Sequence, residues 1–348
     1  MAENSKIEWT NHTFNPWEGC QKVSPGCANC YAERRDQQYH DGEHWGPGGT
    51  RKMMSESYWK QPLKWNKRGT CRECGFAEVI GSDDCRNCGK NFQWERQRIF
   101  CASLADVFED RPDLEVPRRR LFKVIQATPN LDWLLLTKRP ENTHRLTYKA
   151  IDPFDDPDRE NNIAGEPNGL DVADFGDLYP NVWLGTTVEN QEHADKRIPE
   201  LLKIPAKVRF LSCEPLLGSL DLTLLGQSGP TAYPFFDCLR GKENPGPFFR
   251  DAKIHWVIVG GESGSSARPM NPKWARSLRD QCQAAGVPCF FKQWGEWEEE
   301  MFTDEHAAIP DRRAFLFDDG IPMVRSGKKA AGRILDGRTW DELPALAA

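Results

Sequence analysis

Three cysteines lie close together near the start of this 348-residue chain. Cys20, Cys27 and Cys30 have the spacing C-x6-C-x2-C, in a segment whose Gly and Pro residues let the backbone wrap closely around a bound group. Three thiolates in one short loop can hold three irons of a [4Fe–4S] cluster and leave the fourth iron open for another ligand. The spacing therefore indicates a metal site with an open coordination position.

A structural zinc site is the alternative interpretation of this loop. Zinc prefers four ligands, and His12 or His40 could complete a set with the three cysteines. The spacing by itself leaves both interpretations open.

A second cysteine group follows within residues 67–97. Two C-x2-C pairs, each followed by glycine, are separated by ten residues, as in the zinc knuckles of rubredoxin-like ribbons. Two such turns direct four thiolates at one tetrahedral centre, so we predict a metal site, most simply zinc, with a second iron–sulfur cluster as the main competitor. The four ligands are Cys71, Cys74, Cys85 and Cys88.

Charge around this second group suggests a contact surface. The net charge of −6 argues against a general electrostatic hold on nucleic acid, but a local basic patch is compatible with it. Residues 67–98 have such a basic bias, so the insertion could contact nucleic acid or a partner, whereas the alternative is a small insertion that is stabilised by its metal and has no catalytic role. The basic residues are Lys67, Arg68, Arg72, Arg86, Lys90, Arg96 and Arg98.

The remaining five cysteines are scattered along the chain. Isolated cysteines most often act as small buried hydrophobic residues. We therefore expect burial rather than chemistry for most of these five, which are Cys101, Cys213, Cys238, Cys282 and Cys289.

The elements that must position these groups follow a β-then-α pattern. Continuous apolar runs without alternation suit strands buried on both faces, and hence a parallel sheet. The runs are 99–104, 133–137, 182–186, 208–212, 256–260 and 289–292, and helical patterns cover 118–126, 191–202 and 272–285. We predict an α/β fold of the TIM-type (β/α) barrel, partial or complete, with an inserted zinc-ribbon-like knuckle.

The expected organisation has four parts. Residues 1–66 form an N-terminal segment with the first cysteine loop, and 67–97 form the knuckle insertion. Residues 98–299 form the barrel body, with long loops at 149–180 and 226–250, and 300–348 form a C-terminal tail. No apolar stretch reaches the roughly 18 residues of a membrane span, and no signal peptide is apparent, so we expect a cytoplasmic protein without membrane contact.

The chain resembles, nearly end to end, a family of mostly phage-encoded proteins of the radical S-adenosylmethionine (SAM) type. Beside the first cysteine loop, the resemblance rests on a series of ordered motifs. They are IEWT (7–10), NP (15–16), LTKRP (136–140), LGTTVEN (184–190), LSCEPLLG (211–218), GGESG (260–264), FKQWG (291–295) and GRILDG (332–337).

This resemblance favours the iron–sulfur interpretation of Cys20, Cys27 and Cys30, with SAM on the open iron as the source of a 5′-deoxyadenosyl radical. Many of the motifs end an expected strand, and in a TIM-type barrel the strand C-termini form the active site. We therefore expect one mouth of mixed charge, although each residue could equally form a rim salt bridge. Its members are Asp106, Lys138, Arg139, Glu189, Glu214, Glu262, Arg268 and Lys292.

Within that mouth the resemblance implies two groups of site residues. Glu262, Lys138, Glu214 and Lys292 are the expected catalytic residues. The expected SAM-binding residues are Gly260, Gly261, Glu262, Glu189 and Arg268, because GGE resembles the element that binds the SAM amino group in many radical SAM proteins. Here that element follows a late strand rather than the second strand.

The resemblance also implies a substrate class. The expected activity is an isomerisation of 5-Nα-glycinylthymidine to 5-Cα-glycinylthymidine during hypermodification of phage DNA, which protects that DNA from host restriction. Modified DNA and a reductant such as flavodoxin or ferredoxin are the expected partners, in the host cytoplasm if the chain is phage-encoded. The alternatives are another radical SAM modification or repair of nucleic acid, or a non-catalytic zinc-binding adaptor.

Overall fold

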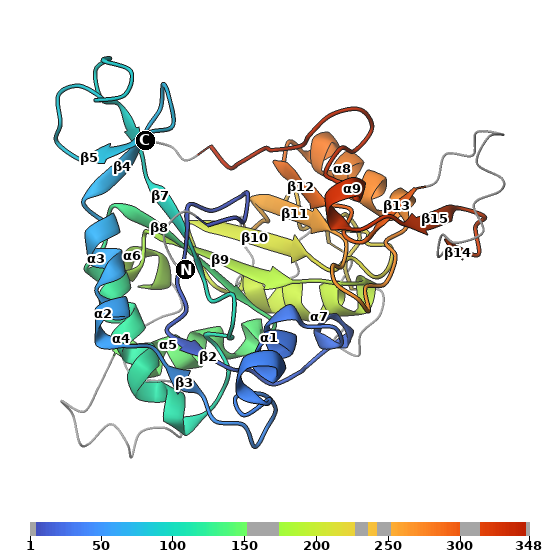
Figure 1. The fold of residues 1–348 in the computed structure, drawn as a ribbon, viewed down its shortest axis with the longest axis horizontal. Helices are drawn as coiled ribbons and strands as arrows, with labels where there is room; N and C mark the ends of the chain where they lie inside the picture. Colours follow the sequence, from blue (N-terminus) through green and yellow to red (C-terminus); the bar gives the residue numbers. More distant parts are fainter. Residues whose placement is uncertain (1–4, 152–173, 227–235, 242–251, 300–313, 346–348) are drawn as a thin grey trace. The chain divides into compact units, whose positions relative to one another are not determined.

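The computed structural model describes residues 5–151, 174–226, 236–241, 252–299 and 314–345 (Figure 1). The chain divides into two compact units, and each is described separately. The first unit contains residues 1–21, 32–185 and 204–207, and the second contains 22–31, 186–203 and 208–348. The predicted long loop at 149–180 lies partly outside the described residues. Its described ends belong to helices α5 (Thr143–Ile151) and α6 (Asp174–Leu178).

The first unit is built on parallel strands in the order β1-β7-β8-β9. They are β1 (His12–Thr13), β7 (Gln97–Cys101), β8 (Leu131–Thr137) and β9 (Val182–Thr187), whose last two residues belong to the second unit. Ile99 pairs with Trp133, and both side chains are completely buried, as expected for a strand covered on both faces. Helix α4 (Glu115–Gln126) packs against α5.

Shorter elements complete the first unit. A two-stranded ribbon and three short helices occupy the N-terminal region: β2 (Trp17–Glu18), β3 (Lys52–Met53), α1 (Tyr31–His40), α2 (Glu56–Trp59) and α3 (Gln61–Trp65). Residues 67–97 form an antiparallel sheet with the order β5-β4-β6, so the predicted insertion has its own small sheet. Its strands are β4 (Arg68–Cys71), β5 (Ala77–Val79) and β6 (Trp94–Glu95).

The second unit repeats the parallel β/α arrangement. Its strands β10 (Val208–Cys213), β11 (Trp256–Gly260) and β12 (Cys289–Gln293) are neighbours in that order. Helix α7 (Gln191–Leu202) follows β9, and helix α8 (Pro272–Ala285) packs on β11 and β12. Side chains of the preceding Asn190 and Asn271 accept hydrogen bonds from the first turns of these helices, and such N-caps fix where a helix begins.

The C-terminal part corrects one prediction. A C-terminal tail was expected at 300–348, but its described residues contain two strands and a short helix, and the two strands form a three-stranded antiparallel sheet with β13 just before them. These are β13 (Trp297–Glu299), β14 (Ala314–Leu316), β15 (Pro322–Arg325) and α9 (Lys328–Ala331). The strands are only three or four residues long, so they lack the periodicity on which the prediction relied.

The coarse fold prediction is confirmed. All six predicted strands and all three predicted helices are present, and seven parallel strands connected in this way are compatible with a partial TIM-like barrel. The five scattered cysteines are buried, as predicted. The predicted loop at 226–250 lies mostly outside the described residues. No helix in the described part of the chain combines the length and apolar character that a bilayer crossing needs.

Candidate functional site

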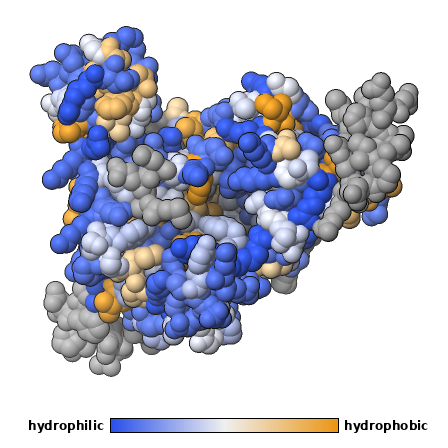
Figure 2. Space-filling model, viewed as in Figure 1, coloured by the Kyte–Doolittle hydropathy of each residue, from blue (hydrophilic) through white to orange (hydrophobic). Residues whose placement is uncertain are grey.

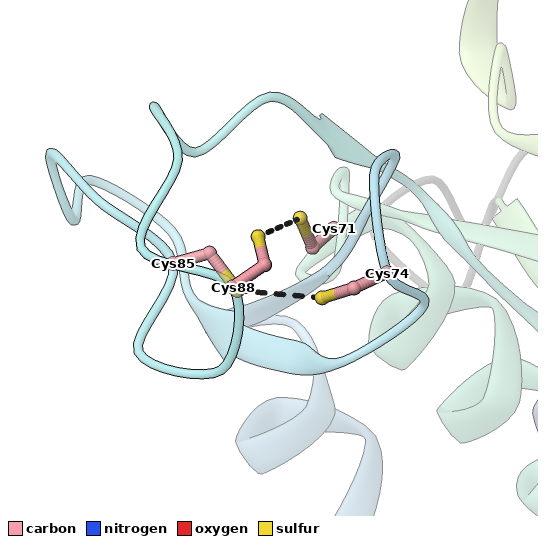
Figure 3. A group of neighbouring side chains, drawn as sticks. All are labelled: Cys71, Cys74, Cys85 and Cys88. Carbon is pink, nitrogen blue, oxygen red and sulfur yellow. Dashed lines mark hydrogen bonds between the residues drawn. The ribbon is translucent and has the colours of Figure 1, made fainter.

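The four cysteines of the insertion converge as predicted (Figure 3). All four sulfurs lie within 4.8 Å of one another, with Cys71 Sγ 3.9 Å from Cys88 Sγ and Cys74 Sγ 3.6 Å from Cys85 Sγ. A tetrahedral zinc ion with Zn–S bonds of about 2.3 Å separates its sulfurs by about 3.8 Å. The group is therefore spaced to hold one metal ion such as zinc.

Local backbone geometry explains this convergence. In each knuckle the glycine after the second cysteine has a positive φ, +71° at Gly75 and +66° at Gly89, which favours glycine over any residue with a Cβ. The N–H of Gly75 donates to the Cys71 carbonyl at 2.8 Å, and that of Gly89 donates to the Cys85 carbonyl at 2.8 Å. The two turns are thus equivalent, and each presents two sulfurs to the same centre.

The cysteines of the knuckles differ in how readily they form thiolates. Despite a hydrogen bond from the Lys90 backbone, burial and the neighbouring cysteines raise the pKa of Cys88 to about 11. Hydrogen bonds from the Asn87 side chain and from the Phe76 backbone lower the pKa of Cys74 to about 6, which favours the thiolate that metals bind. The predicted basic patch is partly neutralised, because Lys90 pairs with Glu73 at 2.5 Å and Arg86 with Glu78 at 3.0 Å. Figure 2 shows hydrophobic atoms among the charged ones on the surface of this insertion, where Phe76 and Val79 are exposed.

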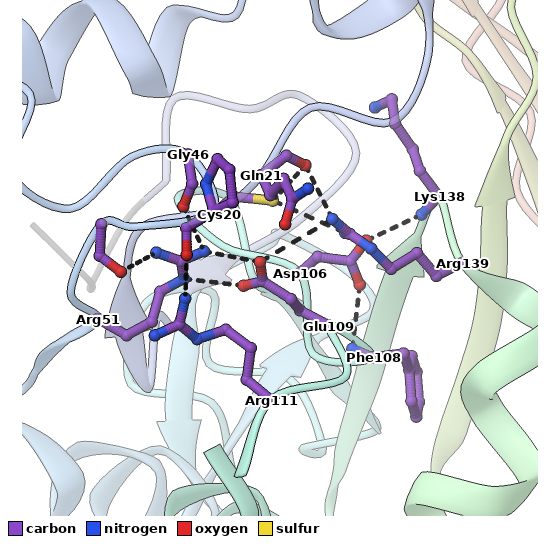
Figure 4. A network of polar contacts seen from close by, with 12 residues as sticks. Cys20, Gln21, Gly46, Arg51, Asp106, Phe108, Glu109, Arg111, Lys138 and Arg139 are labelled. Carbon is purple, nitrogen blue, oxygen red and sulfur yellow. Dashed lines mark hydrogen bonds and ion pairs between the residues drawn. The ribbon is translucent and has the colours of Figure 1, made fainter. Parts of the chain in front are cut away.

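In the first unit, Cys20 lies beside an arginine (Figure 4). Arg139 Nη1 is 3.8 Å from Cys20 Sγ, and Arg139 Nη2 donates to the Gln21 carbonyl at 2.8 Å. Burial and the nearby Asp106 carboxylate raise the pKa of the Cys20 thiol to about 12, although Arg139 acts in the opposite direction. A metal on this sulfur must therefore displace a proton, and the guanidinium would help to balance the resulting thiolate.

Asp106 connects this arginine to the end of strand β8. Its carboxylate accepts hydrogen bonds from Arg139 Nη1 at 2.8 Å, the Thr137 hydroxyl at 2.7 Å and the Lys138 backbone at 3.1 Å. The predicted residues Asp106, Lys138 and Arg139 therefore do lie together. The Lys138 side chain is half-buried.

In the second unit, the segment with Cys27 and Cys30 is held by residues from strand ends. Glu189, just after β9, accepts a hydrogen bond from the Gly26 N–H at 3.2 Å, and its other oxygen accepts from Arg197 at 2.8 Å. The Glu189 side chain is completely buried. Glu189 thus holds the loop together with an arginine of α7, and its contact with a cofactor stays a prediction.

Glu262 and Arg268 hold the same loop from a second side. Glu262 Oε2 accepts from the Asn29 side chain at 2.9 Å, while Arg268 donates to both oxygens of Glu262 and to the Pro25 carbonyl at 3.0 Å. Burial opposes ionisation, but the hydrogen bonds from Arg268 and Asn29 outweigh it and lower the pKa of Glu262. Glu262 is thus an anion that positions the loop, and its contact with SAM remains a prediction.

Glu214 and Lys292 form an ion pair of 3.0 Å at the ends of β10 and β12. A Cβ on Gly260 would lie 2.6 Å from Glu214 Oε1, and one on Gly261 would lie 1.9 Å from the Trp294 carbonyl oxygen. These contacts give a packing reason for both glycines, beside the cofactor role predicted for them.

The structure therefore brings the predicted residues together in three sets of contacts: one around Asp106 in the first unit, and the loop contacts and the Glu214–Lys292 pair in the second. Sequence reasoning missed Asn29 and Arg197, which hold the loop, and the Arg51–Glu109 pair, which is completely buried in the first unit. Asn29 had one signal, because it directly precedes the predicted ligand Cys30. Arg51 and Glu109 had none, since they are 58 residues apart in isolated positions.

The fold and the site define a parallel α/β protein with an insertion whose four cysteines are spaced to hold a metal ion such as zinc. The chain belongs to the DUF5131 family, described as a protein of unknown function, which matches residues 4–344. No curated protein and no solved structure matches the chain.

Proposed function

We propose that this protein is a radical SAM enzyme that holds a [4Fe–4S] cluster on Cys20, Cys27 and Cys30. The main support is the set of contacts on the loop that carries Cys27 and leads to Cys30. Glu189, Glu262 and Arg268 were all expected at the site, and all three contact residues 25–29 of this loop. Such a shell suits ligands that must keep a fixed geometry.

The exposure of the three cysteines is compatible with such a group. Cys20, Cys27 and Cys30 are partly exposed, whereas the five scattered cysteines are completely or almost completely buried. Thiols that must reach a cofactor need this accessibility. When bound, the cluster and SAM would supply a 5′-deoxyadenosyl radical able to take hydrogen from an unactivated carbon.

Residues of the chain would balance charge at the cluster, position its loop and contact the substrate. Arg139 would offset the negative charge of the Cys20 sulfur, and Glu189 and Glu262 would hold the loop in place. The Glu214–Lys292 pair supplies a carboxylate and an ammonium at strand ends, where parallel α/β proteins bind polar substrates. We propose that Lys138, Glu214, Glu262 and Lys292 act on or orient the substrate.

For the substrate we propose a modified base in DNA, specifically 5-Nα-glycinylthymidine, which would be isomerised to its carbon-linked form. The reaction would move the glycyl carbon onto the thymine methylene in place of nitrogen, so the mass is unchanged. The knuckle insertion offers a DNA contact, since Arg86 remains 75% exposed and Lys90 64% exposed despite their ion pairs.

Anaerobic reconstitution tests the proposal. Full-length protein is incubated with iron, sulfide, SAM, dithionite and DNA containing 5-Nα-glycinylthymidine, and nucleosides are separated by chromatography with mass spectrometry. We expect 5′-deoxyadenosine or an isomerised nucleoside of unchanged mass. Cys27→Ala should lose iron, sulfide and activity, and Cys282→Ala should keep all three. Wild-type protein that carries zinc but no inorganic sulfide would overturn the enzymatic proposal.

A zinc-binding adaptor is the second candidate, and the sulfur geometry of the insertion favours it. In that case DNA binding would depend on Cys71 and Cys85, and SAM would have no effect. A different radical SAM reaction would instead give a nucleoside of changed mass. Methylthiolation in particular would require iron rather than zinc on the four cysteines of the insertion.

A further inference from the structure

A second group of metal-ligand side chains lies in the first unit, apart from both cysteine clusters. Asp36 and His40 are four residues apart on α1, so they share one face of the helix, and His44 follows in the next turn. One ligand atom from each of Asp36, His40 and His44 lies within 4.8 Å of the others. Two imidazoles and one carboxylate form a common donor set for divalent transition metals.

The Asp36 carboxylate is the most informative member of this group. The residue is only 4% exposed, and its Oδ2 accepts a hydrogen bond from the His44 N–H at 3.0 Å. Its Oδ1 is buried and has no hydrogen-bond partner among the described residues. A buried, unpartnered carboxylate oxygen costs free energy unless a proton or a cation satisfies it.

The imidazole ring of His44 is also oriented to bind a metal ion. Its Nδ1 lies 2.8 Å from the Thr50 hydroxyl, and such a contact fixes the ring and leaves Nε2 as the nitrogen that can bind a metal. Arg51, completely buried against Glu109, donates to the carbonyls of His44, Gly46 and Gly49. Figure 4 shows Arg51 between Gly46 and Glu109, so the turn that carries His44 has a rigid support.

The surrounding charges favour a cation. Glu18 Oε2 lies 3.8 Å from His40 Nε2, and its carboxylate is also close to Arg35 and Lys52. The Lys52 ammonium lies 3.1 Å from His40 Nε2 but is 43% exposed, so it can turn into solvent when an ion binds. The Asp36 and Glu18 carboxylates would then supply negative charge to the ion, with Glu18 still paired to Arg35 at 2.9 Å.

We propose that Asp36, His40 and His44 bind a divalent first-row transition metal, with zinc as the ion of choice, independently of any cluster on Cys20. Zinc suits a mixed nitrogen and oxygen set, and three protein ligands would leave one position for water or Glu18. The ion would link the end of α1, through Asp36 and His40, to the turn at 41–50, through His44. This site goes beyond the proposed function, because it uses none of the cysteines.

Counting zinc tests the site. Full-length wild-type protein and the variants Asp36→Asn and His40→Gln are saturated with Zn²⁺, freed of unbound ion by gel filtration and analysed for zinc, iron and sulfide. We expect each variant to bind about one zinc ion fewer per chain than wild type. Glu43→Gln, which removes an exposed acid from the same turn, is the charge-matched control and should keep the wild-type count.

Two further readouts keep the test decisive. Zn²⁺ should raise the melting temperature of wild type more than that of His40→Gln, a half-buried position that should tolerate the change. The same proteins are also loaded with Co²⁺ in place of zinc. The difference between the absorption spectra of wild type and His40→Gln should then contain cobalt d–d bands but no thiolate-to-cobalt charge-transfer band. Equal zinc counts in all variants would refute the site, and loss of a thiolate band would assign His40 to the cysteine loop instead. Iron and sulfide contents report separately on the proposed enzyme.

Discussion

The carboxylate of Glu189 accepts a hydrogen bond from the backbone N–H of Gly26 at 3.2 Å, across 163 residues of sequence. This bond joins the end of a parallel strand to the segment that precedes Cys27. A Cβ on Gly26 would lie 3.1 Å from Glu189 Oε1, so the glycine also allows the close approach. The loop is therefore positioned by long-range contacts, and its own sequence supplies the small residues that permit them.

Glu189→Gln should loosen this loop. The substitution keeps the shape but removes the charge that pairs with Arg197 in a buried place, which should cost about 1–3 kcal/mol of unfolding free energy. Hydrogen exchange of residues 24–29 should become faster. Glu192→Gln changes an exposed acid on α7, the helix that carries Arg197. It should leave the unfolding free energy and the exchange rates unchanged. Unaltered exchange in Glu189→Gln would argue against the positioning role.

The buried Arg51–Glu109 pair should matter far more than an exposed pair. The two side chains are 0% and 4% exposed, so Arg51→Met leaves the buried Glu109 carboxylate with only the more distant Arg139, at 4.0 Å, and should cost about 3–5 kcal/mol. Arg145→Met breaks an ion pair whose members are 47% and 53% exposed and should cost about 0–1 kcal/mol. Denaturant unfolding measures both, and similar losses would contradict the prediction.

Gly260→Ala should disturb the Glu214–Lys292 pair. Because the new methyl group would lie 2.6 Å from Glu214 Oε1, the carboxylate must move, and overpacking of this kind costs about 1–3 kcal/mol. We expect a matching loss in the proposed nucleoside assay. Gly48→Ala places its methyl group in open space and is the control. An active and fully stable Gly260→Ala protein would show that this contact is dispensable.

His255 should make the free energy of unfolding decrease as the pH falls. Burial, with help from Arg209 and Lys253, lowers its pKa from 6.5 to about 4 in the folded chain. The unfolded chain therefore takes up a proton first as the pH falls, so stability present above 6.5 is progressively lost between 6.5 and about 4. Unfolding free energies at about pH 7 and pH 4.5 should differ less in His255→Asn than in wild type. His144→Gln should retain the wild-type difference.

Metal removal should unfold the knuckle insertion locally. Cys71→Ser leaves three thiols at a partly buried centre, and small metal-bound units depend on their ion for folding. Hydrogen exchange over residues 67–97 should become fast, in the variant and after treatment of wild type with a strong chelator. Cys282→Ala should keep this segment protected. Protection that survives the loss of metal would mean that β4, β5 and β6 fold without it.

The parallel α/β class, the six long strands, the three main helices and the four-cysteine insertion could all be predicted from the sequence. They depend on local patterns: unbroken apolar runs such as 256–260, helical periodicity such as 272–285, and the paired C-x2-C spacing, whose glycines fix the turns. The short strands after residue 299 could not be found, because three-residue strands depend on their partners rather than on their own periodicity.

Only the tertiary structure decided what the predicted site residues touch. Spacing placed Glu189 and Glu262 at strand ends, but it could not reveal that they hold Gly26 and Asn29, because those contacts connect residues more than 150 positions apart. The Asp36, His40 and His44 group likewise depends on how the chain turns after α1 and on the buried Arg51 that supports the turn. Residue types and spacing thus determined which chemistry the chain carries, and packing determined which groups meet.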